Sequence, residues 1–157
     1  MQCVILWLVL SLAQIAEAMQ VSGVSVHKVF LRQNDPTCVY CLAVSSAMEV
    51  MQRPGTNFLA TQVWPSARTA AAAIQEHANP QFSICEFGCG PGLPALAGAK
   101  MGAKKVYATD VDDLALELVT AAAEGQDLLD RIKTRRFDLL ASTQEDDDDG
   151  MPQADLY

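Results

Sequence analysis

Apolar residues from position 61 onward follow two different periods along the chain. Residues 82–87 and 104–109 are short runs in which apolar residues cluster or alternate, as they do in strands. Residues 93–101 and 114–121 instead place their leucine, alanine and methionine residues on one face at helical spacing. This alternation predicts an α/β fold with a parallel sheet flanked by helices, in which ligands bind at the carboxyl ends of the strands.

Helix boundaries are marked by residues that favour helix ends. Pro65 precedes an alanine-rich run, so a helix is expected to begin there and to stop before Asn79-Pro80. Similar signals bound the two later helices: Gly92 and Gly102 for one, and Asp112 or Asp113 with Gly125 for the other.

The predicted sheet is small. Residues 136–140 are expected to form its third strand, and residues 154–157 have the pattern of the first residues of a fourth. A partial sheet of this kind leaves an unpaired edge and an uncovered apolar face. Between these strands, residues 145–150 are acidic and are expected to form a solvated loop.

The segment before this domain, residues 19–60, is an N-terminal extension with an ambiguous pattern. Residues 21–31 alternate loosely and favour one or two strands, and Asn34-Asp35-Pro36 is a turn signal. Residues 38–51 are apolar and are compatible with either a strand or a helix, which Arg53-Pro54-Gly55 would end. The domain itself is expected to cover residues 61–157.

Residues 1–18 resemble a secretory signal or leader peptide. The apolar run from Val4 to Ala13 is too short for a comfortable membrane span, and Ala16-Glu17-Ala18 has the spacing of a cleavage site. No Lys or Arg precedes the run, and Met19 is an alternative start. Two locations therefore stay open: the secretory pathway or an organelle if the leader is used, and the cytoplasm if translation begins at Met19. No membrane association is expected once the leader is removed.

The formal net charge of −8 is unevenly distributed. Residues 1–109 carry seven Lys/Arg and five Asp/Glu, whereas residues 110–157 carry four and fourteen. An acidic C-terminal third disfavours nucleic acids and anionic membranes as partners. The Cys38-Val39-Tyr40-Cys41 motif has no second pair of ligands at zinc spacing, so buried thiols are expected there, and no metal site.

A glycine motif carries the candidate chemistry. The strand at residues 82–87 runs into Glu86-Phe87-Gly88-Cys89-Gly90-Pro91-Gly92, and the following strand ends at Thr109-Asp110. Alternate glycines let the backbone turn tightly and approach a ligand, while a carboxylate after the next strand can accept hydrogen bonds from ribose hydroxyls. The spacing G-x-G-x-G differs from the dinucleotide fingerprint G-x-G-x-x-G, which makes a nicotinamide-dependent oxidoreductase the weaker alternative.

Strand-E-x-G-x-G-x-G followed by an Asp after the next strand resembles the seven-β-strand (class I) S-adenosylmethionine-dependent methyltransferases. Val63-Trp64-Pro65 upstream and Gly92-Leu93-Pro94 downstream make the similarity greatest to the methyltransferase-like protein-lysine methyltransferases, over residues 61–141. The resemblance implies a Rossmann-like fold, S-adenosylmethionine as the methyl donor, a protein substrate and a set of cofactor-binding residues: Trp64, Glu86, Gly88, Cys89, Gly90, Gly92, Asp110 and, near the adenine, Asp138.

The function expected from this resemblance is methyl transfer to a lysine amine. Such proteins also carry a D-x-x-Y motif after their fourth strand, and the sequence ends at Tyr157, at the start of that strand. Asp155-Leu156-Tyr157 does not have the spacing of this motif, and no residue is assigned as a general base. A truncated, non-catalytic methyltransferase-fold remnant or binding module is therefore the main alternative.

Overall fold

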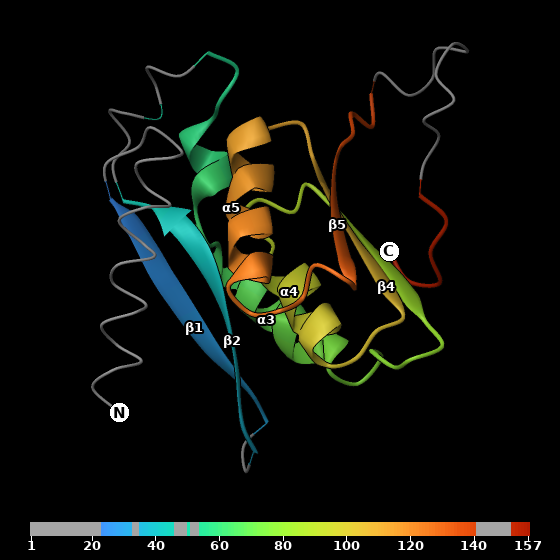
Figure 1. Ribbon diagram of the computed structural model, residues 1–157. Helices are drawn as coiled ribbons and strands as arrows, with labels where there is room; N and C mark the ends of the chain where they lie inside the picture. Colours follow the sequence, from blue (N-terminus) through green and yellow to red (C-terminus); the bar gives the residue numbers. More distant parts are fainter. Residues whose placement is uncertain (1–22, 33–34, 46–49, 51–53, 141–151) are drawn as a thin grey trace.

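The computed structural model describes residues 23–32, 35–45, 50, 54–140 and 152–157. Within these ranges the chain forms a hairpin, a short 3-10 helix and an alternating series of helices and strands (Figure 1). In chain order the elements are β1 (Val24–Arg32), β2 (Asp35–Val44), η1 (Phe58–Thr61), α3 (Pro65–Ile74), β3 (Ser83–Phe87), α4 (Leu93–Lys100), β4 (Lys105–Asp110), α5 (Asp113–Glu124) and β5 (Ile132–Arg136).

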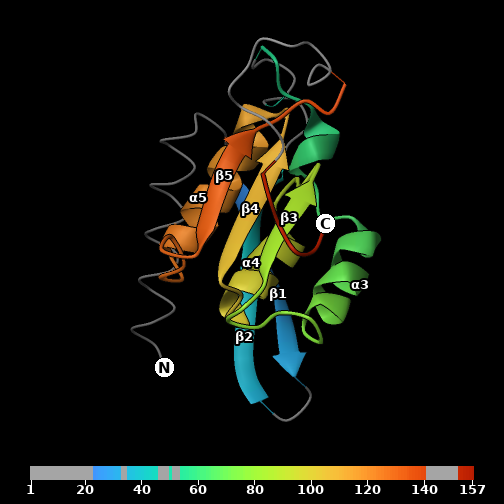
Figure 2. The same ribbon diagram turned by 90° about the vertical axis from the view of Figure 1, so that its right-hand side faces the viewer.

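The central sheet is parallel, with the strand order β3-β4-β5. A further parallel bridge joins Ile84 of β3 to Leu156, at the position where the start of a fourth strand was predicted. Helices α4 and α5 lie behind this sheet in the view of Figure 2. The predicted α/β class, with a partial parallel sheet flanked by helices, is therefore confirmed.

The third strand occupies residues 132–136, so its predicted position at 136–140 is wrong. β5 is mostly charged and buries only Ile132, so its sequence has little of the apolar signal of a strand. The pairing with β4 ends where the Phe137 N–H bonds to the Asp110 carbonyl. The Asp138 carboxylate then accepts the Leu140 N–H, 2.9 Å away, which turns the chain away from the strand direction.

The N-terminal extension contains an antiparallel hairpin of β1 and β2. The apolar stretch that was compatible with either a strand or a helix is a strand through Val44. Arg32 pairs with Asp35, so Asp35 and Pro36 belong to β2, where a turn was predicted. The hairpin covers the helices on the side opposite the sheet, which gives three layers (Figure 1).

Capping residues set the starts of α4 and α5. Gly92 is the N-cap of α4 with a φ of 67°, and of the two predicted caps of α5 it is Asp112 that accepts the Ala115 N–H. α4 lies between the sheet and the hairpin, and its residues 93–99 are all buried. This position explains why α4 is apolar on every face.

An aromatic cluster lies at the end of β3. The Phe87 ring lies 5.7 Å from each of the Phe137 and Tyr157 rings, and Tyr157 stacks on Phe87 nearly parallel.

The leader prediction for residues 1–18 and the acidic loop at 145–150 fall outside the described residues. Within the described part of the chain, no helix has the length and hydropathy needed to span a membrane.

Candidate functional site

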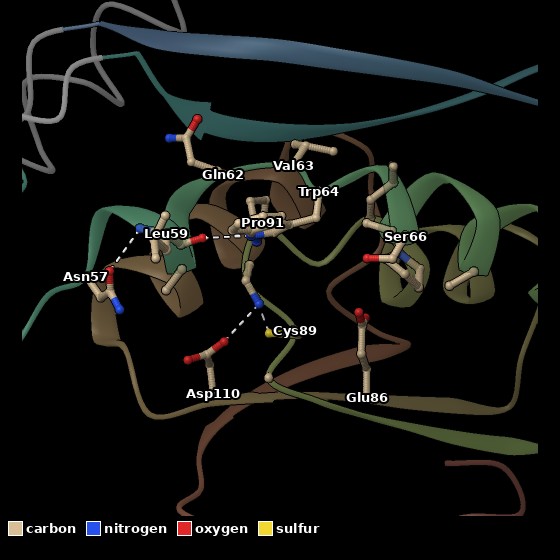
Figure 3. Close-up of a pocket in the computed structure, with 17 residues that line it drawn as sticks. Asn57, Leu59, Gln62, Val63, Trp64, Ser66, Glu86, Cys89, Pro91 and Asp110 are labelled. Atoms are coloured by element: carbon tan, nitrogen blue, oxygen red, sulfur yellow. Dashed lines mark hydrogen bonds between the residues drawn. The ribbon is translucent and has the colours of Figure 1, made fainter.

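A pocket of about 420 Å³ opens at the carboxyl ends of β3 and β4. One side is formed by the turn after β3 and the first residues of α4, together with Asp110 at the end of β4. The opposite side is formed by residues 57–70, which comprise η1 and the first turns of α3. Figure 3 shows the carboxylates of Glu86 and Asp110 directed from the strand ends toward this second wall. Its position is that of ligand sites in parallel α/β sheets.

The glycine turn approaches its neighbours too closely for side chains at two of its positions. A Cβ at Gly90 would lie 2.9 Å from the Ala60 carbonyl oxygen, and one at Gly92 would lie 2.5 Å from a Val119 methyl group. Gly88 has a positive φ of 59°, as the other two glycines do, but it differs from them because a Cβ there would meet no atom within 4 Å. Gly88 lines the pocket, so the missing side chain leaves space for a ligand.

Asp110 holds the glycine turn in place. Its Oδ2 atom accepts the Gly90 N–H at 2.8 Å, and its Oδ1 atom accepts the Asp112 N–H at 3.0 Å. The side chain is only 6% exposed and borders the pocket. Because a carboxylate offers about four acceptor positions, Asp110 keeps capacity for hydroxyl donors of a ligand.

Glu86 lies at the end of β3 beside the first turn of α4. Its Oε2 atom accepts the Ala95 N–H at 2.8 Å. Burial raises the pKa of the Glu86 carboxyl to about 8; the Ala95 hydrogen bond opposes this shift, and the nearby Asp110 charge adds to it. Burial thus favours the protonated form of the Glu86 carboxyl, and a nearby cation would oppose this effect.

The second wall is organised around Trp64, the N-cap residue of α3. The indole Nε1–H donates to the Leu59 carbonyl at 3.0 Å, and the side chain remains 52% exposed (Figure 3). This wall also contains Asn57, Ala60 and Gln62, which the sequence motifs did not single out. The one available signal was Asn57, a residue type that favours helix starts and does cap η1.

The remaining predicted site residues are spread more widely. Cys89 lines the pocket, and burial raises the pKa of its thiol well above the usual value, so it stays neutral. Gly92 packs against Val119 and does not border the pocket. Asp138 lies beyond β5 on the surface and is not brought to the pocket. In the described part of the chain, no three metal-ligating side chains come together.

A parallel sheet with a glycine turn after one strand and a carboxylate at the end of the next defines the Rossmann-like fold of class I methyltransferases. Residues 42–148 match the family model of ribosomal protein L11 methyltransferase (PrmA), and the chain belongs to this family.

Curated relatives match the same region. The chain is 34% identical over 87 residues to the ribosomal protein L11 methyltransferase of Colwellia psychrerythraea, which covers 55% of this chain and 29% of the relative. It is 27% identical over 95 residues to the protein of that name from Oceanobacillus iheyensis, covering 60% and 30% of the two chains. The matched part of the chain thus spans less than a third of these relatives.

Proposed function

We propose that the pocket binds S-adenosylmethionine and that the protein transfers its methyl group to a protein lysine amine. The observation that carries this proposal is the open space at Gly88, in a pocket that Glu86 and Asp110 also line. Family membership supports the chemistry, since the family is one of methyltransferases.

The charges around the pocket fit this cofactor. S-adenosylmethionine, when bound, supplies a methyl group on a positively charged sulfur, and it has no phosphate. Among the described residues that line the pocket, the ionisable carboxyl groups are Glu86 and Asp110, and there is no Lys or Arg. Such a site offers acceptor groups to a cation and offers no side-chain cation to the pyrophosphate of a nicotinamide dinucleotide. The oxidoreductase alternative is therefore disfavoured.

Each residue has a defined part in this binding. Asp110 would accept hydrogen bonds from the ribose hydroxyls while it continues to hold Gly90. Glu86 would ionise beside the methionine ammonium group, because a nearby cation lowers a carboxyl pKa. Trp64 supplies a flat apolar wall opposite the glycine turn. Cys89 and Gly92 are small residues that let the turn pack closely. Asp138 would reach the cofactor only if the segment after β5 moved.

A lysine amine of a protein is the proposed methyl acceptor. The curated relatives are named for methylation of a ribosomal protein, which favours a protein substrate. The likeness of Trp64 and Gly92-Leu93-Pro94 to the protein-lysine group favours an amine. Transfer requires a neutral amine held in line with the methyl group, and such positioning is worth roughly 7–11 kcal/mol of barrier reduction. No side chain of the chain is assigned as a general base.

Binding is tested by calorimetry of the full chain with S-adenosylmethionine, and with a nicotinamide dinucleotide as the competitor. We expect saturable binding that the dinucleotide does not displace. Gly88→Ala should weaken binding, whereas Gly102→Ala is the matched control, because Gly102 has a φ of 95°, equally open surroundings and no contact with the pocket. Absence of binding to folded protein, or equal losses in the two variants, would reject the site.

A cofactor-binding module that performs no transfer is the second candidate. One observation favours it: Glu86 and Asp110 each accept backbone N–H groups that hold α4 and the glycine turn, so both carboxyl groups have structural roles without catalysis. Incubation with methyl-labelled cofactor and lysine-containing protein extracts separates the two. Tight binding without label transfer supports the module, and transfer to lysine supports the enzyme.

A further inference from the structure

The Asp112 side chain bonds both to α5 and to the start of the second wall of the pocket. It is the N-cap of α5 and is 2% exposed. Its Oδ1 atom accepts the Ala115 N–H of α5 at 3.1 Å. Its Oδ2 atom accepts the N–H of Asn57, which is 55 residues earlier in the chain and begins the second wall of the pocket. The side chain does not itself border the pocket.

The two walls of the pocket are thereby connected through hydrogen bonds. On one side, the Gly90 N–H bonds to Asp110, and Asp110 accepts the Asp112 N–H. On the other side, the Asp112 carboxylate holds Asn57, and the wall continues through η1 to Leu59, whose carbonyl fixes the Trp64 indole. The walls meet where the Ala60 carbonyl approaches Gly90.

We propose that Asp112 is a positioning residue for the methyl donor. It fixes the wall that carries Trp64 at a set distance from the glycine turn, and so sets the width of the pocket. This inference rests on the proposed function, because it treats the pocket as the S-adenosylmethionine site. The role is exerted through Asn57 and Asp110, without contact between Asp112 and the ligand.

Replacement of Asp112 can separate this role from helix capping. Asn and Ser are N-cap residues about as good as Asp, so Asp112→Asn and Asp112→Ser keep an acceptor for Ala115. In Asp112→Asn the second oxygen becomes an NH₂ group that faces the Asn57 N–H, so two donors oppose each other. In Asp112→Ser the second acceptor is removed without this conflict.

Asp113→Asn is the matched control. Asp113 lies next in sequence, in the same first turn of α5, and its removal takes away the same charge near the helix N-terminus. It is exposed, and its ion pair is with Arg136, 3.3 Å away on the surface. It has no bond to the pocket wall.

Affinity for S-adenosylmethionine is measured by calorimetry, and wall order by iodide quenching of Trp64 in a Trp7→Phe background, where Trp64 is the single tryptophan. We expect Asp112→Asn to raise the Kd about tenfold or more, Asp112→Ser to raise it less, and Asp113→Asn to change it less than twofold. Quenching should increase in the same order, while all three variants stay folded at the temperature of the measurement.

Unchanged affinity and unchanged quenching in Asp112→Asn would overturn the positioning role and leave the proposed function intact. If the unaltered chain does not bind the methyl donor, the proposed function fails. The quenching measurement then shows by itself whether Asp112 holds the wall that carries Trp64. Equal losses in Asp112→Asn and Asp113→Asn would assign the effect to charge at the helix end and would also overturn the inference.

Discussion

Three glycines share a left-handed backbone in the turn after β3, but each residue has a different neighbour. We expect Gly92→Ala to destabilise the fold by about 2–4 kcal/mol, because backbone strain adds to overlap with Val119. Gly88→Ala should cost only about 1–2 kcal/mol, since its surroundings are open. Urea unfolding of both variants measures the difference, and equal stabilities would show that packing at Val119 is unimportant.

Glu86 should make the stability of the fold depend on pH. Its folded pKa of about 8 lies above the ordinary value of 4.5, so between these values the folded protein retains a proton that the unfolded chain has lost. Stability therefore falls as the pH rises from about 5 to about 8. We expect Glu86→Gln, whose carbonyl can still accept the Ala95 N–H, to flatten this dependence and to be more stable than the unaltered protein above pH 8.

Urea unfolding midpoints between pH 5 and pH 9 test this expectation. Glu76→Gln is the control, because it removes the same charge from an exposed position just after α3. Parallel pH profiles for Glu86→Gln and the unaltered protein would contradict the shifted ionisation of Glu86.

Among the elements, the hairpin is attached to α5 by one side-chain amide. The Gln126 Oε1 atom accepts the Tyr40 N–H at 3.0 Å, and its Nε2 atom donates to the Tyr40 carbonyl at 2.8 Å, as a neighbouring strand would. We expect Gln126→Leu to destabilise the protein by about 1–3 kcal/mol, because it leaves both backbone groups without this partner. Amide hydrogen exchange should accelerate in residues 38–44.

Gln75→Leu is the matched control for this element. Among the described residues, the Gln75 amide bonds to the Ala71 carbonyl of the adjoining helix at 3.4 Å, so its loss should leave exchange in β2 unchanged. Similar exchange rates in the two variants would show that Gln126 does not hold the hairpin.

The elements differ in how far the sequence could predict them. Helix starts at Pro65, Gly92 and Asp112 were predictable because each residue type acts locally, through its own φ or its own side-chain acceptor. β5 was misplaced because its charged residues carry no apolar alternation. Of the second wall of the pocket, Trp64 was predicted, but Asn57, Ala60 and Gln62 were not. Main-chain groups of Asn57 and Leu59 hold this wall, and main-chain groups leave no mark on residue type.

At the scale of the whole molecule, the hairpin closes a core that the sheet covers from one side only. α4 is buried over its residues 93–99, so it needs both layers to exclude water. The sequence predicted one apolar face for this helix, and nothing in it specified that a second segment would cover the other side. That information lies in long-range packing, which periodicity within one element does not contain.

This three-layer arrangement leads us to expect that the hairpin and the pocket at the carboxyl ends of β3 and β4 unfold together. Leu42 of β2 is 1% exposed and belongs to the same buried cluster as Leu93 and Leu96 of α4. We expect Leu42→Ala to destabilise the protein by about 2–5 kcal/mol and to accelerate hydrogen exchange in α4 and β3 as much as in the hairpin. Lys28→Ala, an exposed change on β1, should alter neither quantity. Faster exchange confined to residues 24–44 would instead show that the hairpin opens as a separate unit, and the pocket would then depend on the sheet and helices alone.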